Sequence, residues 1–308
     1  MSPQSATTHP RISVILPCKN EAANLERLLP KLLKTLPEAE ILVVDDGSTD
    51  GSRQVAEGCG ALCVSHPYNI GNGAAVKTGA RHAKGSTLVF MDADGQHDPD
   101  DIPRLLEKLD QGYDMVVGSR ESRSHASLAR HVANHTYNRL ASFMTGFRIL
   151  DLTSGFRAVR ARHFRKFLYL LPNTFSYPTT ITMAFFRSGL PVGYIPIKTA
   201  ARGGRSHIRS MKDGVRFFVI IIKIGALFSP MRLFLPLSAL LFLIGTVYYG
   251  YTFSTSHSFS NMSALLILTS VLTFLIGIIS EQISSLHYKS ISEDSRRAER
   301  KPHSSTDS

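Results

Sequence analysis

The sequence predicts an α/β protein in which a mostly parallel sheet is followed by a membrane-associated tail. In the first half of the chain, short β-branched runs alternate with amphipathic stretches, the rhythm of a parallel sheet with helices on both faces. In the last third, two long runs carry no charged residue. Each approaches the roughly 20 apolar residues that an α-helix needs to cross a bilayer.

Nine elements are expected before residue 118, strands and helices in alternation. The strands are expected at Ile12–Leu16, Ile41–Val44, Ala61–Val64, Thr87–Met91 and Met115–Val117. The intervening helices are expected at Glu21–Lys34, Ser52–Gly58, Gly73–Ala83 and Asp101–Gln111. Because ligands of such folds bind beyond the carboxyl ends of the strands, the polar clusters at residues 19–21, 45–47 and 92–94 indicate a site.

The acidic cluster contains the pattern most informative about chemistry. Asp92 and Asp94 flank one residue directly after an expected buried strand. Two carboxylates at a strand end can bind one hard cation, and Mg²⁺ or Mn²⁺ takes oxygen ligands and bridges readily to a diphosphate. Such a cation would neutralise charge on a departing nucleoside diphosphate. A pair of Asp residues in a loop is also common in solvated turns.

The uncharged runs Leu233–Phe253 and Ser263–Ser280 predict a transmembrane hairpin. The short segment between them, residues 254–261, contains no Lys or Arg. Basic residues flank the pair on its outer sides, at Arg232, Lys289, Arg296, Arg297 and Arg300. By the positive-inside rule both outer ends are cytoplasmic. The alternative is a helical hairpin buried in a soluble core.

A basic arc precedes the hairpin. At helical spacing one face collects Arg209, Lys212, Arg216 and Lys223, opposite apolar residues such as Phe217. This pattern favours a helix in the membrane interface with its basic face toward lipid headgroups. An amphipathic helix packed on the domain would show the same periodicity. Part of the net charge of +11 therefore suits an anionic membrane surface, and no nucleic-acid motif is present.

These patterns divide the chain into five segments. The expected segments are a flexible N-terminus (1–10), an α/β domain (11–208), an interfacial amphipathic helix (209–230), a transmembrane hairpin (231–288) and a flexible cytoplasmic tail (289–308). The chain is thus expected to be an integral membrane protein with its α/β domain in the cytoplasm, at the inner or plasma membrane in a bacterium.

Several motifs occur in a fixed order along the chain: Pro-Cys-Lys-Asn-Glu (17–21), Val-Val-Asp-Asp-Gly-Ser-Thr-Asp-Gly (43–51), Asn-Ile-Gly-Asn-Gly (69–73), Asp-Ala-Asp-Gly-Gln-His (92–97) and Gly-Ser-Arg (118–120). Together they resemble the inverting family 2 glycosyltransferases with a GT-A fold. Asp-Leu-Thr-Ser-Gly-Phe-Arg (151–157), then Arg202 and Gly-Arg-Ser (204–206), resemble the polyprenyl-phosphate branch, which includes dolichyl-phosphate mannosyltransferase. The resemblance spans about residues 12–207.

The resemblance implies inverting, metal-dependent transfer of a sugar from a UDP- or GDP-sugar to undecaprenyl or dolichyl phosphate at the cytoplasmic membrane face. It implies a donor site made by Pro17, Asn20, Glu21, Asp46, Asn69, Gly71 and Arg202. It implies that Asp92, Asp94 and Gln96 hold Mg²⁺ or Mn²⁺ and the diphosphate. The lipid phosphate is expected on Arg120, Arg130, Asn134 and Ser206.

Asp151 and Asp94 are the residues expected to act in catalysis. In most inverting transferases a carboxylate removes the proton of the acceptor hydroxyl. A lipid monophosphate is already ionised near neutral pH, since its second pKa is about 6, and needs no strong base. Asp151 is therefore expected to orient the sugar, the acceptor or Arg157, or alternatively to cap its own loop.

Two rival functions have distinguishable signatures. A processive polysaccharide synthase shares the early motifs but carries a QxxRW motif, and this chain has no tryptophan. A non-catalytic membrane adaptor that binds a nucleotide would not need the Asp92/Asp94 pair and Asp151. The sugar, the nucleotide, the polyprenol and the oligomeric state, including a homo-oligomer, stay open.

Overall fold

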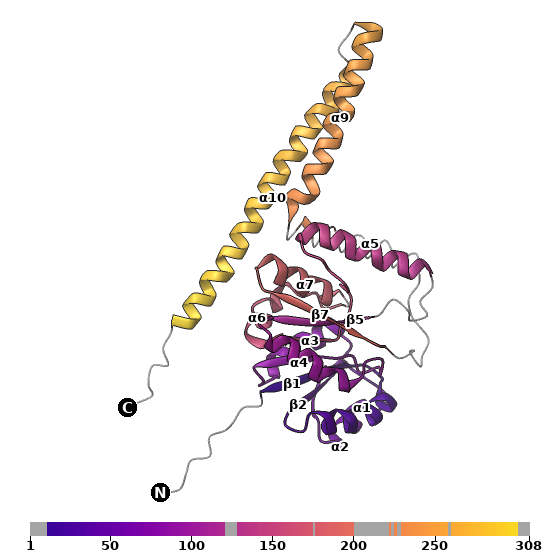
Figure 1. Cartoon of the computed structure of the whole chain (residues 1–308), viewed down its shortest axis with the longest axis vertical. Helices are drawn as coiled ribbons and strands as arrows, with labels where there is room; N and C mark the ends of the chain where they lie inside the picture. Colours follow the sequence, from indigo (N-terminus) through magenta and orange to yellow (C-terminus); the bar gives the residue numbers. More distant parts are fainter. Residues whose placement is uncertain are drawn as a thin grey trace. The chain divides into compact units, whose positions relative to one another are not determined.

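The computed structural model describes residues 11–120, 128–174, 176–199, 222, 225, 226, 229–257 and 260–300 (Figure 1). The chain divides into two compact units. The first consists of Met1–Asn138 and Ile149–Arg209, and the second of Arg139–Arg148 and Ser210–Ser308. The predicted interfacial helix 209–230 lies almost entirely outside the described residues.

A seven-stranded sheet of order β3-β2-β1-β4-β6-β5-β7 forms the centre of the first unit. Its strands are β1 (Ile12–Cys18), β2 (Glu40–Asp45), β3 (Leu62–Ser65), β4 (Thr87–Phe90), β5 (Met115–Arg120), β6 (Arg157–Arg160) and β7 (Val192–Ile197). Strand β6 runs antiparallel to both of its neighbours, and the other pairs are parallel. The predicted mostly parallel α/β class is confirmed.

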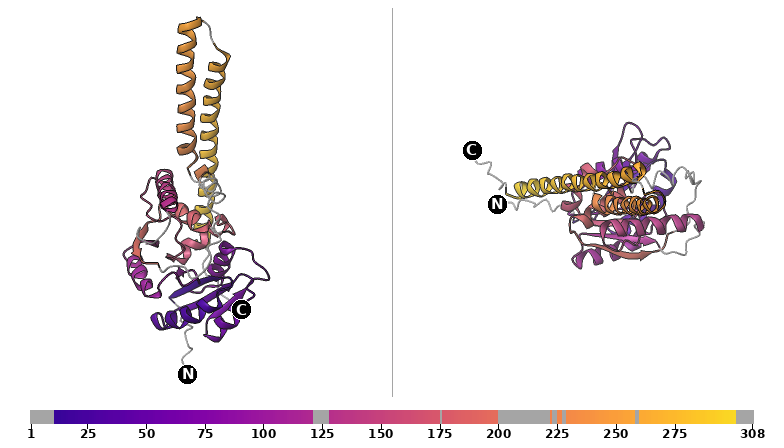
Figure 2. Two further views of the ribbon diagram at one scale, coloured as in Figure 1. Left: turned by 90° about the vertical axis from the view of Figure 1, so that its right-hand side faces the viewer. Right: turned by 90° about the horizontal axis from the view of Figure 1, so that it is seen from above.

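Helices cover both faces of this sheet (Figures 1 and 2). They are α1 (Ala22–Thr35), α2 (Ser52–Gly58), α3 (Asn72–His82), α4 (Ile102–Asp110), α6 (Ala161–Lys166) and α7 (Tyr177–Arg187), with short 3₁₀ turns at Pro99–Asp101 and Leu168–Leu170. Helix α5 (Leu128–Thr145) runs from the first unit into the second. The five strands and four helices predicted before residue 118 are all present, with ends shifted by at most three residues. The elements β6, β7, α5, α6 and α7 were not predicted.

The two faces of the sheet are packed differently. On one face α1 buries a leucine stripe at helical spacing, Leu25, Leu28, Leu29 and Leu32, in a core shared with α2 and α4. On the other face α3 is built from small residues and approaches the sheet closely. An ideal Cβ on Gly79 would lie 2.4 Å from Ile15 Cγ2 and 3.2 Å from Val44 Cγ2. Glycine at this position therefore sets the distance between helix and sheet.

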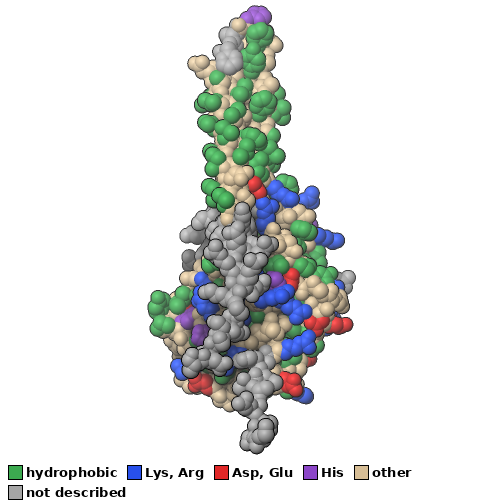
Figure 3. Space-filling view, turned by 90° about the vertical axis from the view of Figure 1, so that its left-hand side faces the viewer, with side chains coloured by type: hydrophobic (Ala, Val, Ile, Leu, Met, Phe, Trp, Pro, Cys, Tyr) green, Lys and Arg blue, Asp and Glu red, His purple; other side chains and the backbone are tan. Residues whose placement is uncertain are grey.

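The second unit contains the hairpin of α9 (Pro230–Ser256) and α10 (Asn261–Arg300). Two candidate membrane spans, Pro230–Thr255 and Asn261–Leu286, have mean hydropathies of 1.8 and 2.5, with only 11% and 17% of their most apolar windows buried. Hydrophobic side chains are visible along the hairpin surface in Figure 3. A hairpin buried in a soluble core is therefore excluded.

Small polar residues on the two hairpin helices are buried, and the helices pack closely, since an ideal Cβ on Gly245 would lie 3.0 Å from Ile267 Cγ1. Ser238 on α9 and Ser263, Ser270 and Ser284 on α10 are all buried, as expected where helix backbones approach closely in lipid. Helix α10 continues beyond residue 288 to Arg300, into the segment expected to be a flexible tail. No Gly or Pro interrupts that stretch, and the helix ends just before Pro302.

The close packing of α3 gives a test of the fold. Gly79→Val should lower the free energy of unfolding by about 1–3 kcal/mol, because the new side chain overlaps Ile15 and Val44. Gly58→Val is the matched control, since nothing lies within 4 Å of its ideal Cβ. Thermal unfolding of the detergent-solubilised full chain should show a midpoint several degrees lower for the first variant only. Equal midpoints would contradict the observed α3 packing.

Candidate functional site

Three loops lie together at the carboxyl ends of adjacent parallel strands, which form one edge of the sheet. Strands β1, β2 and β4 are adjacent and parallel, so the residues after their carboxyl ends gather there. These are residues 19–21, 46–51 and 91–97. Strand β5 ends at Arg120, and antiparallel β6 begins at the same edge, because Arg157 pairs with both Phe90 and Val117.

Hydrogen bonds from backbone N–H groups to side-chain oxygens join the loop after β1 to the loop after β2 and the start of α2. Asn20 N donates to Ser48 Oγ at 2.9 Å, and Thr49 N donates to Asn20 Oδ1 at 2.8 Å. Glu21 N donates to Ser52 Oγ at 3.0 Å. Asn20 has φ 54°, a left-handed conformation that asparagine tolerates better than most residues. Two of the predicted donor-site residues are thereby fixed in place, beside Pro17 near the end of β1.

Asp46 organises the loop between β3 and α3. Its buried carboxylate accepts hydrogen bonds from Ile70 N at 2.9 Å and Gly71 N at 2.8 Å. The ring of His66 bridges Asp46 Oδ1 at 2.8 Å and Thr78 Oγ1 at 2.9 Å. The carboxylate therefore closes residues 66–71 into a defined loop, which lies next to the stretch where a nucleotide was predicted to bind.

Two further predicted donor residues lie in this loop. Gly71 has φ 122°, and its ideal Cβ would be 2.4 Å from Asn173 O, so no side chain fits there. With its amide oriented to satisfy both neighbours, Asn69 donates to Asp46 Oδ2 at 2.5 Å and accepts from Lys19 Nζ at 2.7 Å. Asn69 thus links the loop after β1 to the loop before α3.

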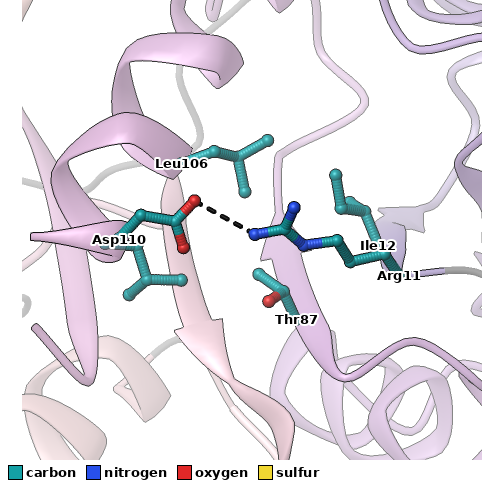
Figure 4. A pocket seen from close by; sticks show the side chains of 6 residues that line it. Arg11, Ile12, Thr87, Leu106 and Asp110 are labelled. Atoms are coloured by element: carbon teal, nitrogen blue, oxygen red, sulfur yellow. Dashed lines mark hydrogen bonds and ion pairs between the residues drawn. The ribbon is translucent and has the colours of Figure 1, made fainter. Parts of the chain in front are cut away.

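Two cavities in the described part of the chain lie near opposite ends of the strands. A cavity of about 410 Å³ is lined by residues of the β2–α2 loop and by residues 65–67, beside Asp46. A smaller one of about 100 Å³ lies where β1 and β4 begin, and Arg11 Nη2 pairs with Asp110 Oδ2 there at 3.1 Å (Figure 4). The larger cavity adjoins the predicted donor residues, whereas the smaller one faces away from them.

Asp92 and Asp94 follow β4 and are held in different ways. Asp94 Oδ1 accepts from Gln96 N at 3.1 Å, which turns the chain back on itself. Asp92 lies against the backbone of Gly155, whose ideal Cβ would be 2.9 Å from Asp92 Oδ2. Any larger residue at position 155 would displace this carboxylate.

His97 lies behind the acidic pair. It is buried, its ring stacks on Phe156 with centroids 5.0 Å apart, and Nε2 is 3.9 Å from Asp92 Oδ2. Burial lowers the pKa of His97 to about 4, so the imidazole is neutral at pH 7. No sequence motif predicted a role for His97, and in the structure it packs between Phe156 and the Asp92 loop.

The residues present fit a cation shared with a diphosphate better than one enclosed by protein. Two carboxylates and the Gln96 amide offer oxygen donors, which suit Mg²⁺ or Mn²⁺. Within the described part of the chain, no group of three or more His, Cys, Asp or Glu side chains is placed to hold a metal. Mg²⁺ is commonly held by one or two carboxylates with substrate phosphates and water completing its shell.

Asp151 and Arg120 form a bidentate ion pair at the same edge. Arg120 Nε donates to Asp151 Oδ2 at 2.8 Å and Nη2 donates to Oδ1 at 3.0 Å. Asp151 Oδ1 also accepts from Thr153 N and Ser154 N. Burial raises the pKa of Asp151, but the hydrogen bonds and charge of Arg120 outweigh burial and hold that pKa below its usual range. Asp151 is therefore ionised and a weak base at neutral pH.

The remaining predicted site residues are described only in part. Arg130 and Asn134 lie on α5, but their side chains are outside the described residues, and Arg202 and Ser206 are outside them altogether. The structure thus brings together the following predicted residues: Pro17, Asn20, Glu21, Asp46, Asn69, Gly71, Asp92, Asp94, Gln96, Arg120 and Asp151.

Comparison with known proteins agrees with this arrangement. Residues 13–168 match glycosyl transferase family 2, and residues 229–286 match the GtrB C-terminal hairpin. Over 185 residues the chain is 36% identical to undecaprenyl-phosphate 4-deoxy-4-formamido-L-arabinose transferase of Klebsiella pneumoniae (strain 342), covering 54% of this chain and 56% of the relative. The chain thus spans little more than half of that relative's length.

A second relative is covered more fully. Polyprenol monophosphomannose synthase of Mycolicibacterium smegmatis is 32% identical over 217 residues, which are 64% of this chain and 81% of that protein. Among solved structures, glucosyl-3-phosphoglycerate synthase of Mycobacterium tuberculosis superimposes with a TM-score of 0.58 at 21% identity, covering 70% of this chain and 80% of that one. Mannosyl-3-phosphoglycerate synthase of Rubrobacter xylanophilus gives 0.57 at 18% identity, covering 69% and 72%.

The solved structures share the fold of the first unit, and the hairpin match covers both apolar helices of the second. The predicted GT-A fold and the predicted membrane hairpin are therefore confirmed. The chain is a membrane protein that belongs to glycosyl transferase family 2.

Proposed function

We propose that this protein transfers a sugar, with inversion, from a nucleotide-sugar donor to a polyprenyl phosphate at the cytoplasmic face of a membrane. One observation carries the proposal. The acidic pair Asp92/Asp94 and the ion pair Arg120–Asp151 meet at one sheet edge of a family 2 domain. That domain is followed by a membrane hairpin.

The relatives support both substrates. The Klebsiella protein is named for undecaprenyl phosphate and the Mycolicibacterium protein for polyprenol. A glucosyl-3-phosphoglycerate synthase of the same fold was crystallised with Mn²⁺ and UDP-glucose. For this chain the proposed donor is accordingly a UDP- or GDP-sugar, and the proposed acceptor is a lipid phosphate that stays anchored in the bilayer.

The donor half of the site would lie beside Asp46. The loops fixed by Asp46 and Asn20 would hold the nucleotide, together with Arg202. Asp92, Asp94 and Gln96 would hold a divalent cation on the diphosphate. A bound Mg²⁺ or Mn²⁺ would offset the negative charge that develops on the leaving nucleoside diphosphate.

The acceptor half would lie on the Arg120 side. A phosphate oxygen of the lipid attacks the anomeric carbon as the bond from that carbon to the diphosphate breaks. Because the phosphate is already ionised, this step needs no proton transfer. We assign Asp151 the role of orienting Arg120, in line with its depressed pKa and bidentate contact. Arg120, Arg130, Asn134 and Ser206 would receive the phosphate.

Proteoliposomes test this function. The full chain is reconstituted with polyprenyl phosphate and given a panel of radiolabelled UDP- and GDP-sugars, and the label is counted in the extracted lipid. One donor should label the lipid, EDTA should abolish the labelling, and Mn²⁺ should restore it. Asp94→Asn should lower turnover about 10²–10³-fold, because charge on the leaving group is no longer compensated.

Asp98→Asn is the matched control. Asp98 lies in the same loop, but its side chain is half exposed and pairs with Lys31 at 2.6 Å, so its loss should change turnover little. Nucleotide binding without turnover by the wild-type protein would show an adaptor instead. Polymeric product would show a processive synthase. Full activity of Asp94→Asn would contradict the proposed role of Asp94 in binding a divalent cation.

The orientation of the hairpin can be tested by cysteine labelling of intact cells. Cys59 and Cys63 are first replaced by alanine. Cys18 can stay, because burial raises the pKa of its thiol to about 11 and keeps it unreactive. An impermeant maleimide should label Ser258→Cys in the short loop and spare Ser305→Cys in the tail. The reverse pattern would place the site outside the cell, away from cytosolic sugar nucleotides.

A further inference from the structure

Arg157 heads the largest fully buried side chains of the described residues, and the proposed reaction does not use it directly. It is the first residue of β6, between the carboxyl ends of β4 and β5, and its exposed fraction is 0%. Within the described residues it has no ion pair with a carboxylate, and its Nε has no hydrogen-bond partner. A buried charge without a counterion is costly, so some function must favour its retention.

The guanidinium donates its hydrogen bonds to backbone carbonyls and to α7. Nη2 donates to Ser154 O, and Nη1 donates to Pro178 O at 3.3 Å and Thr182 Oγ1 at 3.2 Å. The group also lies 5.8 Å from the ring centroid of Tyr177. Arg157 therefore ties the turn formed by residues 151–155 to the first turns of α7, which is buried from Tyr177 to Phe186.

Tyr177 holds the next carbonyl of the same turn. Its hydroxyl donates to Gly155 O at 3.4 Å. Two successive carbonyls, those of Ser154 and Gly155, are thus fixed from the interior. On the other side of this turn, Ser154 N donates to Asp151 Oδ1 at 3.1 Å, and Gly155 forms the surface against which Asp92 rests.

Both carboxylates therefore depend on the position of one short segment. If the Ser154–Gly155 peptide moved, Asp151 would lose a hydrogen bond, and Asp92 would lose its supporting surface. The positive charge of Arg157 also acts through space on Asp151 and Asp92. A bulky apolar residue could fill the same volume, but it would neither bind the carbonyls nor supply this charge.

We propose that Arg157, with Tyr177, is a positioning residue that fixes the Ser154–Gly155 carbonyls and thereby sets Asp151 toward the acceptor and Asp92 toward the donor diphosphate. This inference rests on the proposed function. It differs from a purely structural role, because it predicts that loss of Arg157 weakens ligand binding at Asp92 beyond any loss of stability.

The experiment compares four variants of the full chain in detergent: Arg157→Met, Arg157→Lys, Tyr177→Phe and Arg165→Met. Arg165 is the matched control, because it also donates to backbone carbonyls, those of Ala80 and Ala83 at the end of α3, away from the site. For each variant, thermal unfolding gives stability, and electron paramagnetic resonance gives the affinity for Mn²⁺ in the presence of UDP and of GDP. Turnover and both KM values are measured in proteoliposomes.

Both methionine variants should unfold at lower temperature than the wild type. Of these two, only Arg157→Met should weaken Mn²⁺ binding in the presence of nucleotide, about 10–100-fold, the range for losing a residue that orients a metal ligand. Arg157→Lys and Tyr177→Phe should fall between wild type and Arg157→Met.

Wild-type affinity for Mn²⁺ and unchanged KM values in Arg157→Met would overturn the inference. If Arg157→Met does not fold, Tyr177→Phe decides, because it removes a single hydroxyl: unchanged Mn²⁺ binding in that variant would overturn the inference as well. A wild-type protein that binds Mn²⁺ and nucleotide but transfers no sugar would instead contradict the proposed function.

Discussion

The buried carboxylate of Asp151 is the group on which the candidate site depends. A carboxylate at this depth needs a partner, because removal of the partner would leave a buried negative charge uncompensated. Arg120 supplies two hydrogen bonds from the end of β5, and Thr153 and Ser154 supply backbone N–H groups. This single ion pair joins β5 to the turn before β6. Gly155 in that turn lies against Asp92 and supports it.

Asp46, directly after β2, is a second buried carboxylate that is stabilised by hydrogen bonds. Both of its oxygens accept backbone N–H groups, which closes the loop before α3 beside the larger cavity. Two aspartates therefore build loops, whereas Asp92 and Asp94, whose side chains are only partly buried, are the carboxylates proposed to bind the cation. Asp46, Asp92, Asp94 and Asp151 can lie at one edge of the sheet because two of these charges are compensated. Arg120 pairs with Asp151, and backbone N–H groups stabilise the carboxylate of Asp46.

The sequence was sufficient for β1 to β5, because β1, β2, β4 and β5 contain runs of buried β-branched or large apolar residues. Strand β3 is partly exposed, and its short apolar run follows the same alternation with helices. The sequence was insufficient for β6, where Arg-Ala-Val-Arg shows no apolar run, since Arg157 is buried through hydrogen bonds and not through hydrophobicity. The motifs correctly predicted that the candidate site residues gather at the carboxyl ends of the strands. They did not show that Arg120 and Asp151, 31 positions apart, are bonded to each other, because such a pairing arises only when β5 and β6 meet in the sheet.

The central claim, that Asp151 orients Arg120 and does not act as a base, is tested most directly by the pH dependence of kcat in Asp151→Asn, Arg120→Gln and the double variant. Both single variants should raise the KM for lipid phosphate and leave the shape of the kcat profile unchanged. The double variant should be no worse than either single variant, because the two residues act as one unit. An Asp151→Asn variant whose kcat collapses and climbs steadily with pH, as expected on loss of a general base, would contradict the account.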